Sequence, residues 1–431
     1  MPTKLFVSGK NWKLSLAELA AYLNARNANF KINFYSKEFF KIKIDEKTAP
    51  AIDDLGGTIK IGEAMVQIPT LLIKQALFEK DKQAEIRIIE AIFSSGLVDG
   101  VAEAAGKAFF GVSVYCADRN LSPHSRLIQR FFGSLMKDEL AERGKKSKFM
   151  GFSRDRKQPQ LSHVEVLKKK LLETKGDVLV CISAQETWLG VTVAVHNPFE
   201  FQKRDIYKPN QRRIFAMPPR VARIMVNLSA CTPGKVLLDP FCGVGTILQE
   251  ALLEQAKVIG VDNNAWCVKA ANENLDWLTK EYGLQGTDFR VVQGDVSKLA
   301  QKIGQETVDC IVTEPDLGPA LRQVPTGPYA QRIIQKLEPL YFEFVEQAFK
   351  VLKEGGRLVV VTPYIVTRSG QAVTMRIYDK CESLGFKENS PFSKEIFSSS
   401  EKGVDSLTDL SSLIEVDERH KIGREIHIYQ K

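Results

Sequence analysis

A short strand, a glycine turn and a helix follow one another in the second half of the chain, and this order constrains the fold more than any other feature. Residues Val236–Asp239 have strand preference, and Gly243 and Gly245 form the turn. Apolar residues recur with helical spacing over 247–252. Glycines in a β-to-α turn let backbone N–H groups approach a ligand that a Cβ would hold away. The signal is weak alone, because Leu248 stands where the third glycine of the dinucleotide fingerprint would fall, and an ordinary tight turn stays open.

The residues after this turn predict four further strands, three of which end at acids. We expect these strands at 257–262, at 289–295, at 308–318 with its closing turn and at 357–362, and together with the strand before the turn the acids of the strand ends are Asp239, Asp262, Asp295 and Glu314. Helical patterns separate the strands, which indicates an α/β fold with a mostly parallel, doubly wound sheet. Ligands of such sheets bind beyond the carboxyl ends of the strands, where the acids fall. Asp262 follows the glycine turn by about twenty residues, a spacing typical of the acid that accepts hydrogen bonds from ribose hydroxyls.

Length and composition indicate a soluble protein of more than one domain. The chain has 431 residues, of which 44% are hydrophobic and 26% charged, enough for a sizeable core. It contains no apolar run of about eighteen residues, and its start lacks the basic and apolar parts of a signal peptide. Its 7 cysteines are scattered without a Cys-x-x-Cys pair, so we expect reduced thiols, no metal site and a cytoplasmic protein without membrane association.

The net charge of +8 is spread unevenly along the chain. Basic residues crowd two stretches, which contain Arg126, Arg130, Lys137, Arg143, Lys145, Lys146, Lys148, Arg154, Arg156, Lys157, Lys168, Lys169, Lys170 and Lys175 in the first and Lys203, Arg204, Lys208, Arg212 and Arg213 in the second. Such clusters beside a catalytic domain suggest a polyanion whose phosphates they neutralise. A solvated helix face is the alternative, and for Lys168–Lys170 both interpretations stay open.

The chain divides into four segments. We predict an α+β region at 1–75, a second α+β module at 76–197, a polar, basic, proline-bearing linker at 198–216 and the glycine-turn domain at 217–431. Helices are expected over 15–23, 122–143, 162–173 and 217–228. The first of these helices is expected to begin with Ser15 as its N-cap, and Glu18 three residues later would complete a capping box.

Seven short motifs resemble those of a known family in the same order over nearly the whole chain. They lie at 6–19, 55–60, 188–195, 203–207, 217–223, 239–246 and 423–426. The family is that of the THUMP-containing tRNA guanosine-N2-methyltransferases. The resemblance implies an N-terminal ferredoxin-like region at 1–75, a THUMP domain at 76–197 that grips the acceptor end of tRNA, and a class I methyltransferase domain that uses S-adenosylmethionine.

The resemblance also implies roles for residues at the strand ends. The turn from Asp239 to Thr246 would hold the methionine part of the cofactor, Asp262 the ribose and Asp295 the adenine. These roles agree with those expected from the strand ends alone. The full set of implied cofactor residues is Asp239, Phe241, Gly243, Gly245, Thr246, Asp262, Asn263, Asp295 and Val296.

The implied catalytic turn departs from the family pattern. In the family, and in amino methyltransferases generally, it reads Asp or Asn, Pro, Pro, then Tyr or Phe, whereas this chain has Glu314, Pro315, Asp316 and Leu317. By the resemblance, the first side-chain oxygen and the proline carbonyl accept the hydrogens of an exocyclic amine, and the aromatic ring stacks on the base. Glu314 keeps the carboxylate with one more methylene, Pro315 is retained, and Leu317 cannot stack as an aromatic ring would.

The combined interpretation is an S-adenosylmethionine-dependent tRNA methyltransferase, with N2 of a guanosine in the tRNA body as the expected target. The RNA would be held by Lys203, Arg204, Lys208, Arg212, Arg213, Lys168 and Lys169. Two other classes stay open: a catalytically silent tRNA-binding protein with a degenerate site, and an amino methyltransferase that acts on another nucleic acid. The basic N-terminal half argues against a small-molecule substrate. The modified nucleotide, the number of methyl groups and the need for a small activator protein or a second copy also stay open.

Overall fold

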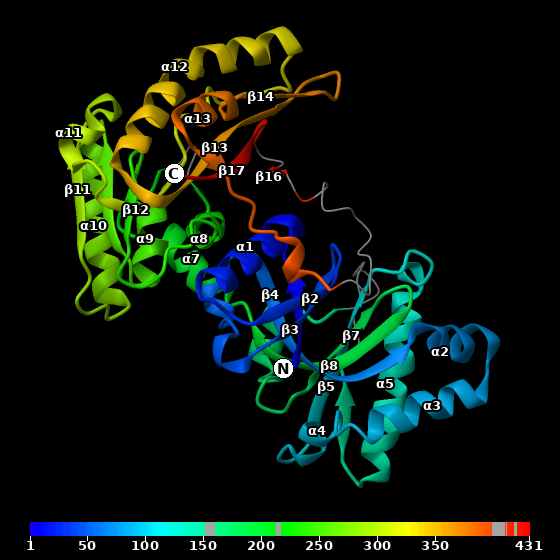
Figure 1. The fold of residues 1–431 in the computed structure, drawn as a ribbon. Helices are drawn as coiled ribbons and strands as arrows, with labels where there is room; N and C mark the ends of the chain where they lie inside the picture. The colour runs from blue at the N-terminus through cyan, green and yellow to red at the C-terminus, as the bar shows by residue number, and fades with distance from the viewer. Residues whose placement is uncertain (151–159, 213–216, 399–409, 411, 418–419) are drawn as a thin grey trace.

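One continuous sheet runs through the N-terminal half of the protein (Figure 1). The computed structural model describes residues 1–150, 160–212, 217–398, 410, 412–417 and 420–431. The strand order in this sheet is β2-β3-β1-β4-β8-β7-β5-β6. Its strands are β1 (Thr3–Ser8), β2 (Phe30–Tyr35), β3 (Phe39–Ile44), β4 (Thr58–Pro69), β5 (Ala108–Cys116), β6 (Ser147–Phe149), β7 (Asp177–Ile182) and β8 (Glu186–Val195). The helices of this half are α1 (Trp12–Ala25), α2 (Thr70–Lys74), α3 (Lys82–Phe93), α4 (Asp99–Glu103), α5 (Ser125–Glu142) and α6 (His163–Lys168).

Strand β4 joins the two predicted N-terminal modules. It is 12 residues long and pairs antiparallel with β1 on one side and with β8 on the other. The two modules therefore share one hydrogen-bonded sheet. The division at residue 75 into a ferredoxin-like and a THUMP region stays a prediction.

The predicted linker is partly helical. In α7 (Pro198–Ile206), the side chain of Asn197 accepts a hydrogen bond from the N–H of Phe199, and Pro198 occupies the first turn, where proline is tolerated. Residues 198–206 of the predicted linker thus form a helix, and the assignment of 198–216 as a linker stays a prediction. Residues 213–216 lie outside the described part of the chain.

The C-terminal half folds around a second sheet with the order β11-β10-β9-β12-β13-β17-β15. The strands from β11 to β13 are parallel, and β17 is antiparallel to β13, so the predicted α/β fold with a mostly parallel sheet is confirmed. The strands are β9 (Val236–Asp239), β10 (Lys257–Asp262), β11 (Phe289–Gln293), β12 (Val308–Thr313), β13 (Leu352–Val366), β14 (Ala372–Thr374), β15 (Lys387–Glu388), β16 (Leu413–Glu415) and β17 (Ile422–Gln430). The helices are α8 (Pro219–Leu228), α9 (Thr246–Leu253), α10 (Ala265–Glu281), α11 (Leu299–Ile303), α12 (Gly327–Val351) and α13 (Tyr378–Leu384).

The direction of winding changes between β9 and β12. The chain proceeds from β9 outward to β10 and β11, and then crosses to β12 on the other side of β9. In open α/β sheets, ligands bind outside the carboxyl ends of the strands at such a switch point. The fold therefore places the candidate site beyond Asp239 and Thr313, the last residues of β9 and β12.

The first helix begins earlier than predicted, and this changes the role of two residues. The N-cap of α1 is Asn11, so Ser15 and Glu18 lie inside the helix and the predicted capping box is wrong. Both side chains are buried and turn toward the segment before β4. Ser15 donates to the carbonyl of Gly57 over 2.8 Å, and Glu18 accepts from the N–H groups of Gly56 and Gly57 over 2.7 Å.

Glu18 also connects the two halves of the molecule. Its carboxylate accepts a third hydrogen bond, of 2.8 Å, from the side chain of Asn227 in α8. Burial raises the pKa of Glu18 to about 7, although the three donors and Arg220 oppose this shift. Leu14, Ala17 and Ala21 of α1 belong to the same apolar core as α8 and the second sheet. The contact between α1 and α8 is therefore part of the core. Figure 1 shows these two helices between the N-terminal sheet and the second sheet.

The C-terminal part of the chain returns to the N-terminal half. Phe397 forms a backbone bridge with Ile32 of β2, and Ile396 and Leu410 belong to the apolar cluster beneath α1. Strand β16 pairs with β17 and also contacts α1. Residues 396–415 thus form a second set of contacts between the two halves, in addition to that of α1 with α8.

Two chemical properties concern the whole fold. The 7 cysteines are free and buried, as the sequence predicts for reduced thiols. Within the described ranges, the structure contains no helix with the length and apolar character needed to cross a bilayer, and no His, Cys, Asp and Glu cluster able to hold a metal ion.

We expect Glu18→Ala to lower the free energy of unfolding by roughly 2–4 kcal/mol, because it leaves buried N–H donors without an acceptor. Urea denaturation measures this change. Glu343→Ala is the matched control, because Glu343 also lies inside a helix but is exposed. Equal midpoints for the two variants would contradict the role assigned to Glu18.

Candidate active site

The end of β9 is tied to the end of β12 by a buried carboxylate. Asp239 accepts a hydrogen bond of 2.7 Å from the hydroxyl of Thr313 and one of 3.2 Å from the N–H of Phe241. Burial raises the pKa of Asp239 to about 7, and these two donors oppose the shift. Asp239 therefore links the end of β12 to the end of β9 and to the first residues of the glycine turn.

The glycine turn has the backbone geometry that the sequence predicts. Gly243 and Gly245 have φ values of 52° and 86°, in the left-handed region that favours glycine. A Cβ on Gly245 would also lie 3.3 Å from the Cβ of Ala271 in α10. Thr246 is the first residue of α9, so the turn delivers the chain directly into the helix. The turn thus requires glycine at two positions by its backbone conformation, and at Gly245 the neighbouring helix also limits the space for a side chain.

The acid after the glycine turn contacts it directly. One carboxylate oxygen of Asp262 accepts from the N–H of Gly243 over 2.9 Å, and the other accepts from the N–H of Asn264 over 2.9 Å. Each oxygen can accept a further hydrogen bond, and Asp262 is half-buried with Asn263 exposed beside it. This arrangement leaves the carboxylate able to accept hydrogen bonds from a ligand with two adjacent hydroxyls.

The third acid lies on the open side of the same edge. Asp295 is exposed, and its carboxylate accepts from the N–H and the hydroxyl of Ser297 over 2.9 Å and 2.8 Å. These two hydrogen bonds hold the pKa of Asp295 below its usual value. Val296 is buried beneath it. The structure thus arranges Asp239, Asp262 and Asp295 in order along neighbouring strand ends.

Glu314 follows β12 and is held by an arginine from the last strand. The Nε of Arg424 in β17 donates to one oxygen of Glu314, and its Nη2 donates to the other over 3.3 Å. The two side chains are 10% and 6% exposed. Burial raises the pKa of Glu314, and the charge and hydrogen bonds of Arg424 oppose this shift.

The rest of the predicted catalytic turn points elsewhere. Leu317 is 6% exposed and belongs to the apolar core, so its assignment to the catalytic site is wrong. Asp316 is exposed, and its side chain accepts from the N–H of Gly318 over 2.9 Å, so it shapes the turn. Pro315 is buried directly after Glu314. Of this turn, Glu314 and Pro315 remain as candidates for contact with a substrate.

A small cavity lies between these elements. Its volume is about 70 Å³, and it is lined by Arg212, Met217, Asp239, Phe241, Cys242, Gly243, Val244, Thr246, Ile247 and Glu314. It therefore brings together the glycine turn, Asp239 and Glu314. Because a water molecule occupies about 30 Å³ in the liquid, this cavity encloses only a small part of a ligand. The remainder would lie over Asp262 and Asp295 at the surface.

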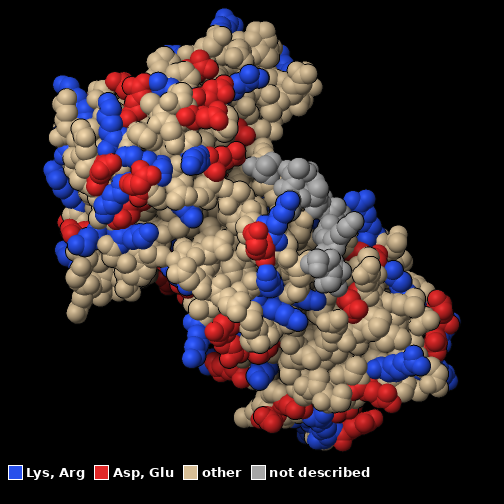
Figure 2. All heavy atoms as spheres, in the orientation of Figure 1, with Lys and Arg blue, Asp and Glu red and all other residues tan. Residues whose placement is uncertain are grey.

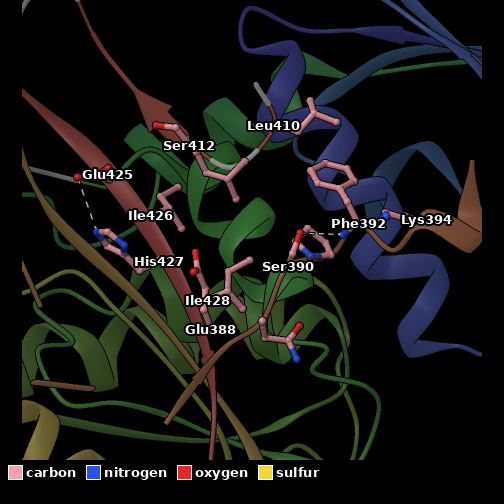
Figure 3. Close-up of a pocket in the computed structure, with 13 residues that line it drawn as sticks. Glu388, Ser390, Phe392, Lys394, Leu410, Ser412, Glu425, Ile426, His427 and Ile428 are labelled. Carbon is pink, nitrogen blue, oxygen red and sulfur yellow. Dashed lines mark hydrogen bonds and ion pairs between the residues drawn. The ribbon is translucent and has the colours of Figure 1, made fainter. Parts of the chain in front are cut away.

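A larger cavity, shown in Figure 3, has a different lining from the small one. Its volume is about 400 Å³, and its walls come from β17 and residues 388–394 together with Leu410, Ser412 and Leu413. Glu425 and His427 lie 3.8 Å apart there, and burial lowers the pKa of His427 to about 4. This cavity follows the antiparallel edge of the sheet, so it does not contain the acids or the glycines of the candidate site.

Two residues of the predicted RNA-binding group are buried. Arg204 is 5% exposed and donates to both oxygens of Glu250, over 2.7 Å and 3.3 Å. Lys208 is 4% exposed and donates to the hydroxyl of Thr246 over 3.1 Å. Both predictions are therefore wrong, because these cations are already paired inside the protein and cannot reach a phosphate at the surface.

The other basic residues of the prediction differ in exposure. Lys203 is half-buried and pairs with Glu281, and Arg212 is exposed beside the small cavity. Lys168 and Lys169 are exposed at the end of α6, which is shorter than predicted. Arg213 lies outside the described residues, as do Arg154, Arg156 and Lys157.

A basic groove that the sequence prediction did not single out lies on α5 and β6. We define it by its lining residues Arg130, Gly133, Ser134, Lys137, Ser147, Lys148 and Phe149, and its volume is about 450 Å³. Its three cations are exposed. On the face drawn in Figure 2, Lys and Arg are interspersed with Asp and Glu.

Sequence reasoning also missed Arg424 and Thr313. Arg424 belongs to the motif at 423–426, but no spacing rule connects it with a glutamate 110 residues away. Thr313 is the last residue of β12, and a hydroxyl at that strand end is the signal that could have identified the partner of Asp239.

Comparisons with known proteins agree with this geometry. Residues 209–369 match the UPF0020 family, described as an RMKL-like methyltransferase domain, and residues 114–273 match a family described as DNA methylase. The solved structure of TrmN from Thermus thermophilus aligns with 100% of this chain and 99% of its own, with a TM-score of 0.53 and 15% identity. This likeness concerns the fold alone.

Curated relatives match parts of the chain. The tRNA (guanine(10)-N2)-dimethyltransferase of Methanothermobacter thermautotrophicus is 39% identical over 36% of this chain and 42% of its own length. The Pyrococcus abyssi protein of the same description is 30% identical over 52% of this chain and 60% of its own length. The U6 snRNA (guanine-N(2))-methyltransferase THUMPD2 of Bos taurus is 29% identical over 33% of this chain and 24% of its own length. The chain thus spans about half the length of the first two relatives.

The strand order, the glycine turn and the acids at the strand ends define a class I methyltransferase domain. The resemblance that the sequence motifs indicate is confirmed as well, because parts of the chain are similar to tRNA (guanine(10)-N2)-dimethyltransferases and to THUMPD2.

Proposed function

We propose that the protein transfers a methyl group from S-adenosylmethionine to the N2 amine of a guanosine in tRNA. The observation that carries this proposal is the small cavity at the switch point. Glu314 and the glycine turn both line it, and the N–H of Gly243 donates to Asp262. A cofactor bound at the turn and an amine held by Glu314 would therefore share one cavity.

The residues of the strand ends fit this cofactor. Asp262 has spare acceptor capacity for ribose hydroxyls, Asp295 and Val296 would face the adenine, and the turn from Asp239 to Thr246 would hold the methionine part. When bound, S-adenosylmethionine supplies an electrophilic methyl group on a sulfonium and leaves as the neutral thioether. The positive charge of the sulfonium suits an edge of the sheet that carries several acids.

The chain's own residues would prepare the target amine. An exocyclic amine is a poor nucleophile because its lone pair is delocalised into the ring. The Glu314 carboxylate and the Pro315 carbonyl would accept its two hydrogens, which directs the lone pair toward the methyl group. The hydrogen bond to Glu314 strengthens as the amine becomes cationic, and the proton that the amine then loses passes to this carboxylate. Leu317 is buried, so base stacking must come from outside this turn.

The basic groove supports RNA as the substrate rather than a small molecule. Arg130, Lys137 and Lys148 are exposed around a hollow large enough for a phosphate group. Two relatives are named as tRNA methyltransferases, which supports tRNA in particular. Neutralised phosphates release their counterions, and this release drives binding.

Two observations keep other functions in consideration. Glu314 is already paired with Arg424, which favours a silent tRNA-binding protein if no amine reaches the acceptor positions that this pair leaves free. The relative named for U6 snRNA and the match to a DNA methylase family favour another nucleic acid as the substrate. Mass spectrometry of nucleosides after incubation of labelled cofactor with tRNA, U6 snRNA or DNA distinguishes these cases.

Asp262→Ala is expected to weaken S-adenosylmethionine binding by about 1–3 kcal/mol, since hydrogen bonds to a charged group contribute this much. Isothermal titration calorimetry measures the effect. Asp288→Ala is the matched control, because Asp288 is exposed at the opposite end of the same sheet, before β11. If the unmodified protein binds no cofactor, the proposal fails at its first step.

Glu314→Gln is expected to slow single-turnover methyl transfer by roughly 100-fold or more while binding of tRNA and cofactor stays unchanged, because the lost interaction belongs to the transition state. Glu314→Asp restores the family residue and should retain more activity than Glu314→Gln. A Glu314→Gln protein as fast as its parent would show that the carboxylate takes no part in catalysis.

The basic groove should make tRNA binding depend on salt. Replacing Arg130, Lys137 and Lys148 by Ala is expected to reduce the slope of log affinity against log salt by roughly one per phosphate contact. The triple Ala variant of Lys168, Lys169 and Lys170 removes the same number of positive charges from another exposed site. A difference in salt slope between the two variants therefore reports the position of the lost charges and not their number. Equal slopes for both variants and the parent would rule out the groove as the phosphate site.

A further inference from the structure

Arg424 and Glu314 form a buried ion pair with two points of contact. Its planar guanidinium donates from Nε to one carboxylate oxygen and from Nη2 to the other, and both side chains are at most one-tenth exposed. A two-point contact of this kind fixes the plane of the carboxylate as well as its position. Glu314 has one more rotatable bond than the aspartate of the family pattern, and the contact removes that freedom.

The third nitrogen of the Arg424 guanidinium bonds to a second acid. Nη1 donates to Glu415 of β16 over 3.1 Å. The backbone on both sides of Glu415 is in turn held from the N-terminal half, because Asn11 donates to the carbonyl of Ile414 and Lys10 to that of Val416. The guanidinium is therefore held by Glu314 and Glu415, and Glu415 lies on a segment that the residues before α1 hold in place.

The charge on Glu314 matters because an ionised carboxylate is an acceptor only, whereas a protonated carboxyl group carries an O–H donor and cannot take up the proton of an amine. Burial raises its pKa, Arg424 opposes that shift, and Glu415 adds to it. The other groups that face Glu314 are His420 before β17, Asp239 at the end of β9, Tyr341 on α12 and Arg212 across the small cavity. Among these groups, Arg424 is the cation in direct contact with both oxygens.

The contact with Arg424 leaves room for a substrate. A carboxylate has about four acceptor positions on its two oxygens, and the guanidinium uses two of them. One position on each oxygen can thus still receive a hydrogen from an amine. The same contact that neutralises Glu314 within the protein therefore also orients its remaining acceptor positions.

We propose that Arg424 is the positioning residue of the methyl-transfer site, which keeps Glu314 ionised and directs its free acceptor positions toward the target amine, with Glu415 limiting how strongly it does so. This inference rests on the proposed function. It predicts that neutralising Arg424 and neutralising Glu415 shift the pKa of Glu314 in opposite directions.

The test measures the pH dependence of single-turnover methyl transfer to tRNA. Loss of the cation in Arg424→Gln raises the pKa of Glu314, so the acidic limb of the profile is expected to move up by about 1–3 pH units. Glu415→Gln removes a negative neighbour, so the limb is expected to move down. Arg424→Lys keeps the charge but not the two-point contact. Its limb should stay near that of the parent while its rate falls.

A purely structural role for Arg424 gives a different result. In that case Arg424→Gln lowers thermal stability and the rate, but the acidic limb stays in place, and the proposal is overturned. Arg357→Gln is the control, because it removes a half-buried cation from β13 far from Pro363, the residue of β13 that pairs with Arg424. It should leave the limb unchanged.

NMR titration of isotope-labelled glutamate carboxyl groups in the full chain gives a readout that needs no activity. The resonance lost in Glu314→Gln identifies Glu314, and its pKa should rise in Arg424→Gln and fall in Glu415→Gln. If the parent methylates no nucleic acid while these shifts occur, the proposed function fails and the electrostatic role of Arg424 stands. If methyl transfer occurs without these shifts, the inference about Arg424 fails and the proposed function stands.

Discussion

Carboxylates removed from water need donors inside the protein, and the structure depends on how it supplies them. An unpaired buried charge costs several kcal/mol, so each such acid fixes the position of the groups around it. Asp177 in the first sheet receives hydrogen bonds from Lys60, Ser113 and Thr192. Asp239 and Glu314 are satisfied in the same way at the switch point. Fold and site are therefore positioned by one physical constraint.

The joint between the two halves shows this constraint most clearly. Besides the contact of Glu18 with α8, Glu250 of α9 accepts from both Arg204 of α7 and Arg223 of α8. Arg223 also pairs with Glu254, which Arg26 of α1 reaches from the other half over 2.7 Å. This explains why part of the basic sequence is unavailable to a polyanion. A cluster of cations in the sequence can face inward when acids of neighbouring helices require them.

The sequence predicts the second sheet well because its evidence is local. Each parallel strand contains a short apolar run, an acid ends or closely follows β9, β10, β11 and β12, and the positive φ values of Gly243 and Gly245 follow from the residue type. Long-range pairs cannot be predicted in this way. The pattern at Ser15 resembles a capping box, but the helix begins at Trp12 because Asn11 caps it, and the tertiary contact of Glu18 overrides the local pattern. The partner of Glu314 escaped prediction for the same reason, since β17 reaches it only through the fold.

The unusual catalytic turn keeps its geometry by other means than the family pattern. A second proline would restrict the backbone after the first one, and here Asp316 occupies that place. Its side chain accepts from the N–H of Gly318, and its carbonyl accepts from the hydroxyl of Tyr341 in α12 over 3.1 Å. Leu317 is then directed into the core, where it anchors the turn. Relative to the family pattern, the turn therefore lacks the stacking ring but stays rigid, and it holds Glu314 and Pro315 as the proposed function requires.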